Sequence, residues 1–164
     1  MGKTELASYI QSLGLSSKLQ TFRVDFEKRL EFQKTIYLLQ ESGADLGYQF
    51  GWYKHGPYSS SLADDVYSLG TIPPEVLASF QVDVNHDAIK KFKELTSEEP
   101  NANAHYLELI SSVDYVTSHS YPRARTKKEA VDSIFTLKGD RFTRSAIENA
   151  YELLKRKGFI REKE

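Results

Sequence analysis

The stretch YQFGWYKHGPYSSSLADDVYSL, residues 48–69, decides how the chain folds. It opens with aromatic residues at every second position from Tyr48 to Trp52, which is the spacing of one face of a β-strand. Gly56-Pro57 is expected to break that strand, because glycine allows unusual φ values and proline lacks an amide hydrogen. Serines then supply helix-capping side chains, and leucine and valine follow at helical spacing. The stretch therefore predicts a strand, a tight turn and a helix.

Outward from this stretch, apolar residues recur at helical spacing over most of the chain. The segment Asp25–Glu41 carries apolar residues on more than one face, which is typical of a central helix packed on several sides. The sequence therefore predicts a mainly α fold: about seven helices in a compact bundle with one small β element, a strand near residues 47–54 that leads by a Gly-Pro turn into a helix. A single strand cannot satisfy its backbone hydrogen bonds, so it needs a partner, and Leu19–Phe22 and Phe80–Val84 are the candidates.

The composition fits one globular domain. The chain has 164 residues, of which 40% are hydrophobic, enough for a substantial core. We expect a single domain over residues 1–164 with two possible sub-lobes, an aromatic strand-turn-helix core over 1–96 and a basic helical hairpin over 104–164. The polar segment Thr96–Asn103 would separate them.

Cysteine usage and hydropathy narrow the class of protein further. The chain has no cysteine, which excludes disulfides, thiolate zinc sites and cysteine nucleophiles. No apolar run is long enough to span a bilayer and no signal peptide opens the chain, so we expect a cytoplasmic protein.

Charge is distributed unevenly although the net charge is −1. Residues 121–164 hold 12 Lys/Arg and 7 Asp/Glu, whereas residues 1–120 hold 10 and 16. A basic C-terminal third can meet an acidic partner or a phosphate backbone. The same charges are also what solvated helix faces carry, and both interpretations stay open.

The turn after the aromatic strand is the strongest candidate site. A cation, an imidazole and a phenol gather there beside a helix N-terminus, whose unpaired backbone donors suit a carboxylate or a phosphate. Exposed aromatic residues are typical of protein interfaces, and we expect Phe50 and Trp52 to face inward and the neighbouring tyrosines outward. A purely structural turn with capping serines remains the alternative. The predicted partner-binding residues are Tyr53, Lys54, His55, Gly56, Pro57, Tyr58 and Ser59.

Catalysis has little support. Ser59–Ser61 with His55 and the Asp64-Asp65 pair are the residue types of a hydrolase triad, but no Gly-x-Ser-x-Gly elbow is present. The four histidines show no metal-ligand spacing, and neither a P-loop nor a Gly-x-Gly-x-x-Gly motif occurs. We therefore expect no metal, no cofactor and no enzymatic activity, with an unrecognised enzyme at His55 and Ser59–Ser61 as an alternative.

The last two predicted helices, about 126–138 and 143–157, have the arrangement of a helix-turn-helix pair. This makes a winged-helix-like DNA-binding regulator the first alternative, ahead of an enzyme, although Glu148 and Glu152 would place negative charge beside the reading helix. Generic helix hairpins of this kind also serve core packing. The possible nucleic-acid contacts are Arg123, Arg125, Lys127, Arg144 and Lys155.

Four short segments carry a family resemblance: QKTIYLLQ at 33–40, LGYQF at 46–50, WYKHGPYS at 52–59 and LADD at 62–65. In this order they resemble the YwgA-like group of small prokaryotic proteins. That group is similar in turn to the Panacea domain of phage-associated, SocA-like antitoxins.

The resemblance implies a mainly helical cytoplasmic domain that works by binding protein. The leading hypothesis is a non-catalytic interaction module, antitoxin- or adaptor-like, of prokaryotic or phage-associated origin. Its expected partner is a toxin or another phage or host protein, with nucleic acid the less favoured partner. A homodimer is also possible, because the surplus of aromatic residues could be buried between two copies.

Overall fold

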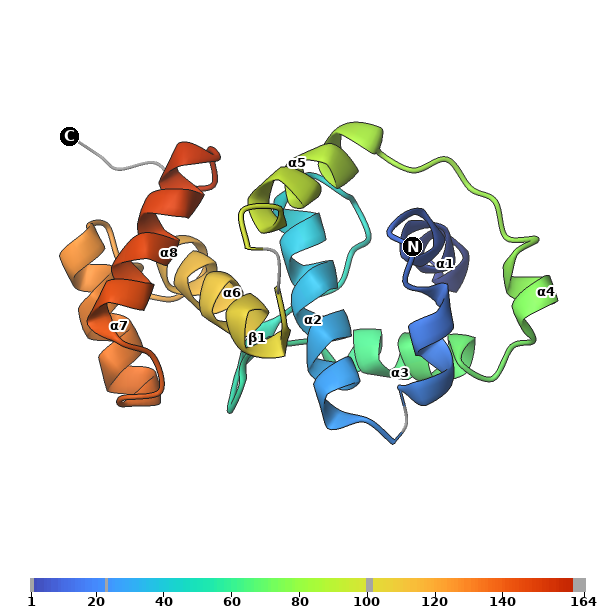
Figure 1. The fold of residues 1–164 in the computed structure, drawn as a ribbon, viewed down its shortest axis with the longest axis horizontal. Coiled ribbons are helices and arrows are strands. Elements are labelled where there is room, and N and C mark those ends of the chain that lie inside the picture. The colour runs from blue at the N-terminus through green and yellow to red at the C-terminus, as the bar shows by residue number, and fades with distance from the viewer. Residues whose placement is uncertain (1, 23, 100–101, 161–164) are drawn as a thin grey trace. The chain divides into compact units, whose positions relative to one another are not determined.

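The computed structural model describes residues 2–22, 24–99 and 102–160. These residues form a mainly helical protein with one small antiparallel sheet of two strands (Figure 1), which confirms the predicted fold class. The chain divides into two compact units, Met1–Phe92 and Lys93–Glu164. The division falls inside α5 (His86–Thr96), a few residues before the polar segment at which the sequence places a boundary. A single domain over 1–164 stays a prediction.

The first unit is built around α2 (Phe26–Glu41). Asp25 caps this helix by accepting a hydrogen bond from the Lys28 amide at 3.2 Å, and all residues from Phe32 to Leu39 are buried. A helix buried on every side needs neighbours all round it, as the apolar pattern predicts. The helices that precede and follow it in this unit are α1 (Lys3–Ser12), the 3₁₀ helix η1 (Ser16–Thr21), α3 (Ser60–Leu69) and the short α4 (Pro74–Leu77).

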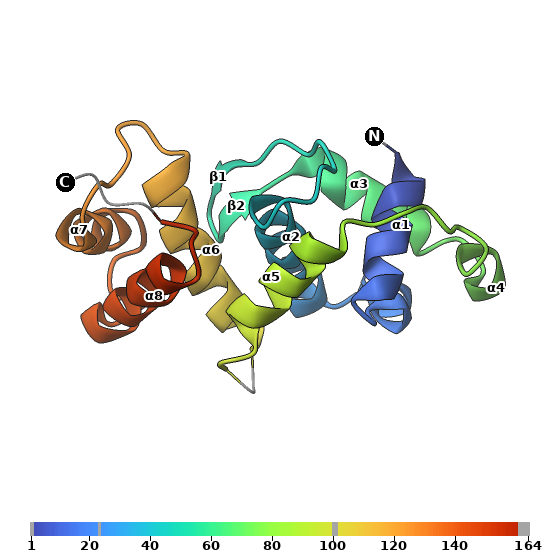
Figure 2. The same ribbon diagram turned by 90° about the horizontal axis from the view of Figure 1, so that it is seen from above.

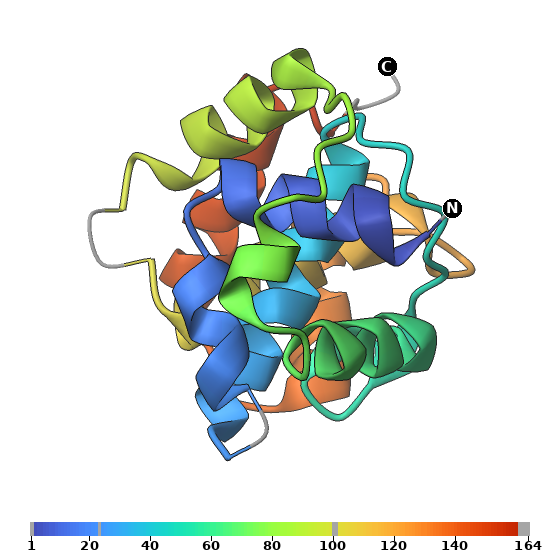
Figure 3. The same cartoon turned by 90° about the vertical axis from the view of Figure 1, so that its right-hand side faces the viewer.

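The N-terminal helices and α3 complete the core of this unit. The helix α3 packs against α1, η1 and α2, and it buries Leu62, Val66 and Leu69 along one stripe. Figure 3 shows α1 and α4 in front of α2, with α3 beside them. The helix predicted from the apolar spacing after the capping serines is therefore present as α3.

The β element differs from the prediction. Strands β1 (Gly51–Tyr53) and β2 (Gly56–Tyr58) pair with each other, in antiparallel register, as a hairpin beside α2 (Figure 2). The predicted partners were wrong: Leu19–Phe22 lies mostly in η1, and Phe80–Val84 has no regular structure.

Local backbone chemistry explains both differences. Gly56 does not end the strand. With φ at 93° it occupies the left-handed region directly after Lys54 and His55, whose φ values are negative, a pattern that closes a tight hairpin. The strand also starts later than predicted, because the Gln40 side chain takes both backbone groups of Tyr48, each at 2.9 Å, in place of a strand partner.

The second unit contains three long helices in mutual contact: α6 (Ala104–Ser118), α7 (Lys127–Lys138) and α8 (Arg144–Arg156). Asn103, Thr126 and Thr143 cap their N-termini by accepting from backbone amides, as their residue types favour. Within the residues described, none of the helices is long and apolar enough to cross a membrane.

Candidate functional site

A pocket of about 290 Å³ lies beside the hairpin in the first unit. Side chains from the start of α2, the hairpin turn and α3 enclose it, and we call it the hairpin pocket. Its lining residues are Phe22, Phe26, Arg29, Leu30, Gln33, Lys34, Tyr53, Lys54, His55, Gly56, Tyr58 and Ala63.

Aromatic side chains form part of the walls of the hairpin pocket. Phe26 and Tyr53 remain 49% and 55% exposed, although both are large apolar side chains that folding normally buries. Tyr53 packs edge-on against Tyr58, with ring centroids 5.2 Å apart. Exposed aromatic rings at the mouth of a pocket are typical of binding surfaces.

Basic side chains lie beside these rings. The Arg29 guanidinium carbon is 5.5 Å from the centre of the Phe26 ring, within cation–π range. The His55 ring meets the same phenyl ring edge-on, with centroids 5.1 Å apart, and Lys54 is exposed in the hairpin turn. None of the described residues that line the hairpin pocket is acidic, so its potential favours a negatively charged ligand.

The hairpin is fixed to α2 by two buried side chains of that helix. The Gln33 amide donates to the Ser59 carbonyl oxygen and accepts from the Ser59 amide, both at 2.9 Å. The neighbouring Lys34 donates from Nζ to the Pro57 carbonyl oxygen at 2.5 Å. Buried polar groups are costly unless they are hydrogen-bonded, so these contacts hold the hairpin in one position.

Five of the seven predicted partner-binding residues line the hairpin pocket: Tyr53, Lys54, His55, Gly56 and Tyr58. The other two do not. Pro57 is buried in β2, and Ser59 is buried as the N-cap of α3, where its hydroxyl accepts from the Leu62 amide at 3.2 Å. The binding role of these seven residues stays a prediction.

The helical half of the pocket was missed from the sequence. Phe26, Arg29, Leu30 and Gln33 recur three or four residues apart, the spacing of one helix face. The sequence signal that could have indicated this half of the pocket is the presence of Arg29 and Gln33 on the same helix face as Phe26 and Leu30.

The other aromatic residues of the deciding stretch serve the core in part. Phe50 and Trp52 are half-buried rather than fully inward, and Phe50 meets the Tyr37 ring edge-on at 5.2 Å. The Tyr48 hydroxyl donates to the Asp65 carboxylate at 2.6 Å. Burial, together with that hydrogen bond, raises the pKa of Tyr48 above its ordinary value.

The residues considered for a catalytic triad have separate structural contacts. His55 packs on Phe26, the Ser59 hydroxyl lies 3.1 Å from that of Ser61, and Asp65 accepts from Tyr48. Their observed contacts therefore describe helix capping and side-chain packing.

The residues considered for nucleic acid lie in the second unit. Arg123 and Arg125 are exposed in the segment before α7, and Lys155 is exposed in the last turn of α8. Lys127 forms an ion pair with Glu152 at 3.0 Å, and the Arg144 guanidinium carbon lies 5.6 Å from the centre of the Phe135 ring. At least two of the five are therefore engaged by side chains of their own unit.

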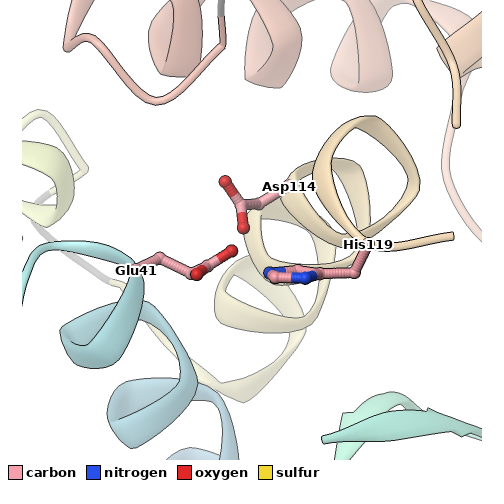
Figure 4. Close-up of side chains that lie close together, drawn as sticks. All are labelled: Glu41, Asp114 and His119. Carbon is pink, nitrogen blue, oxygen red and sulfur yellow. The ribbon is translucent and has the colours of Figure 1, made fainter. Parts of the chain in front are cut away.

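Two potential metal ligands of the second unit, Asp114 and His119, come from α6 and the residue directly after it (Figure 4). Two side chains are fewer than the three or four protein ligands of zinc sites. Glu41, the third side chain in that figure, belongs to α2 of the first unit, where it accepts from the Tyr37 hydroxyl at 3.2 Å. Neither unit by itself therefore assembles a metal site from these residues.

Comparison with protein-family models, with curated proteins and with solved structures finds no match to the chain. Its function must therefore be argued from the geometry above. The hairpin pocket offers the most for that argument, because it combines aromatic walls, nearby cations and a fixed frame.

Proposed function

We propose that the chain is a non-catalytic protein-interaction module that docks a partner protein at the hairpin pocket. The observation that carries the proposal is the aromatic, cation-flanked hollow beside a hairpin that is fixed to the central helix. Protein interfaces concentrate their binding energy in a few aromatic and arginine side chains placed at a pocket. A preformed frame also lowers the entropy lost on binding.

An antitoxin- or adaptor-like role of prokaryotic or phage-associated origin is the form of this module that we favour. The resemblance of residues 33–65 to the YwgA-like and Panacea motifs supports it. Several residues of those motifs, namely Gln33, Lys34, Pro57 and Ser59, bind one another in this chain. In this proposal the motif builds the frame, and the side chains around the hairpin pocket select a toxin or another phage or host protein.

Site-specific photo-crosslinking in the native host tests the proposal. A photoreactive phenylalanine analogue replaces Tyr53 at the mouth of the hairpin pocket. The matched control carries the analogue at Tyr67, which lies on α3 of the same unit, is 49% exposed and does not line the pocket.

The proposal expects a discrete protein adduct from position 53 that is absent or much weaker from position 67. The adduct at position 53 should also disappear when Tyr58 is replaced by alanine in a variant that still folds. Equal labelling from both positions, or no protein adduct from position 53, would contradict docking at the hairpin pocket.

A further inference from the structure

The chemistry of the hairpin pocket also indicates what kind of partner segment fits it. This inference rests on the proposed function. We infer that the partner docks through an acidic segment that inserts one aromatic side chain into the hairpin pocket. The size of the pocket, the charges around it and the apolar surface left outside it each support this occupant.

The size of the pocket suits a single ring. Pockets for small molecules and cofactors usually enclose about 300–1,000 Å³, and the hairpin pocket encloses about 290 Å³. One tyrosine, phenylalanine or tryptophan side chain fits such a volume and buries roughly 150–250 Å² of surface. Tyr53, Tyr58 and Phe26 present ring faces and edges against which an inserted ring can pack.

The charges select carboxylates on either side of that ring. Arg29, on α2, and Lys54, in the hairpin turn, come from two different elements that both line the pocket. A guanidinium can bind a carboxylate through two parallel hydrogen bonds, and contact with an aromatic ring holds it in place. Arg29 already has this contact with Phe26. A basic segment would instead meet like charge from both elements.

The exposed apolar surface favours a segment of a protein over a free small molecule. Phe26 and Tyr53 each keep about half of their surface exposed. A ring-sized molecule inside the pocket would leave much of that surface in water, whereas the chain on either side of an inserted side chain can cover it. An acidic segment with an aromatic anchor therefore satisfies the size, the charge and the exposed apolar surface together.

Selection from a random peptide display library on the immobilised full chain tests this occupant. We expect enriched peptides to carry an aromatic residue flanked by Asp or Glu. Their affinity should fall about tenfold or more in Arg29→Glu and in Lys54→Glu, and it should fall with added salt. Lys90→Glu, which makes the same charge change on exposed α5 surface of the same unit, should leave affinity unchanged. Circular dichroism verifies that each variant folds.

The other outcomes overturn the inference in distinguishable ways. Enriched peptides that are basic or show no charge preference, or no enrichment at all, would refute the acidic segment, and an adduct at position 53 would then leave the proposed function standing. Binding of indole-3-acetate with no peptide enrichment would indicate a small-molecule site. A dimer in sedimentation that Tyr53→Ala dissociates would make a second copy the occupant. Absence of any protein adduct at position 53 would contradict the proposed function itself.

Discussion

Among the described residues of the second unit, Glu108 is the charged residue with the least exposed surface. Lys138 donates to its carboxylate from Nζ at 2.7 Å, and Arg141 donates to both oxygens at 2.8 Å. Burial by itself would raise the pKa of Glu108, but the hydrogen bonds from Arg141 and Lys138 outweigh it and lower the pKa from its ordinary value of 4.5. The side chain of Lys138 is only 2% exposed, so its ammonium group is costly to bury and the pairing with this carboxylate offsets part of that cost.

Removing only the acid should therefore be costly. We expect Glu108→Leu to lower the free energy of unfolding by about 3–5 kcal/mol, because it removes one member of a buried ion pair with the Lys138 amine. The double variant Glu108→Leu/Lys138→Met should recover much of that loss, since two apolar side chains can replace a buried ion pair.

Urea unfolding measures the free energy of unfolding of the single and the double variant. Asp132→Asn, which removes the charge from an exposed pair with Lys128 on α7, is the control and should change little. A double variant no more stable than Glu108→Leu would contradict the assigned role of Lys138.

A single side chain, that of Gln33, links the hairpin to α2 through two hydrogen bonds to the Ser59 backbone. Gln33→Ala removes the side-chain oxygen that accepts a hydrogen bond from the buried Ser59 amide, and it should cost about 1–3 kcal/mol, the penalty for a buried polar group left unsatisfied. Thermal unfolding followed by circular dichroism measures it, with Gln49→Ala at an exposed position as the control. Equal melting temperatures for the two variants would show that the amide does not fix the hairpin.

At the scale of elements, α3 and η1 are in close contact at Gly70, the C-cap of α3. A Cβ atom at this position would lie 2.8 Å from the Leu19 carbonyl oxygen, well inside van der Waals contact. Because both atoms belong to backbone or are fixed to it, one of the two elements must move to admit a side chain.

Gly70→Ala should therefore destabilise the protein by about 1–3 kcal/mol, as overpacking does. Gly51→Ala is the matched control, because its Cβ would meet the Tyr53 ring at an ordinary 3.5 Å. Differential scanning calorimetry compares them. An unchanged melting temperature for Gly70→Ala would contradict the observed packing of α3 on η1.

Helices were predictable because their signals are local. Asp25, Thr126 and Thr143 lie directly before apolar periods and cap the helices that begin there. The hairpin was not predictable in the same way. Where its first strand begins depends on Gln40, which lies eight residues before Tyr48 in the sequence and binds the backbone groups of Tyr48. Glycine at position 56 is equally suited to ending a strand and to closing a hairpin, and tertiary contacts decide between them.

The same distinction applies to the candidate site. Tyr53, Lys54 and Tyr58 could be chosen from one short stretch because they stand together in the sequence. Phe26 and Arg29 precede them by more than 20 residues, and they join the pocket only because the hairpin packs on α2. Sequence periodicity identifies such a helix face without telling which element will cover it.

At the scale of the whole molecule, the lowered pKa of Glu108 predicts that the free energy of unfolding decreases as the pH falls into the acid range. The folded-state pKa lies below 4.5, so the native state favours the ionised carboxylate. This stabilisation is fully present above the unfolded-state value and is lost as pH falls through the folded-state value.

Glu108→Gln should therefore reduce the loss of stability between about pH 5 and about pH 3 relative to the unaltered chain. Denaturant midpoints measured across that range provide the comparison, since the other carboxylates titrate in both proteins. Identical pH profiles would contradict a carboxylate whose pKa is lowered by Lys138 and Arg141.

The central claim, docking at the hairpin pocket, is tested most directly by NMR titration of the isotope-labelled full chain with its best selected peptide. We predict amide shift changes concentrated in the first turns of α2 and in residues 53–58, and lost in Lys54→Glu. Changes concentrated in Arg144–Arg156, with the hairpin amides unmoved, would contradict it.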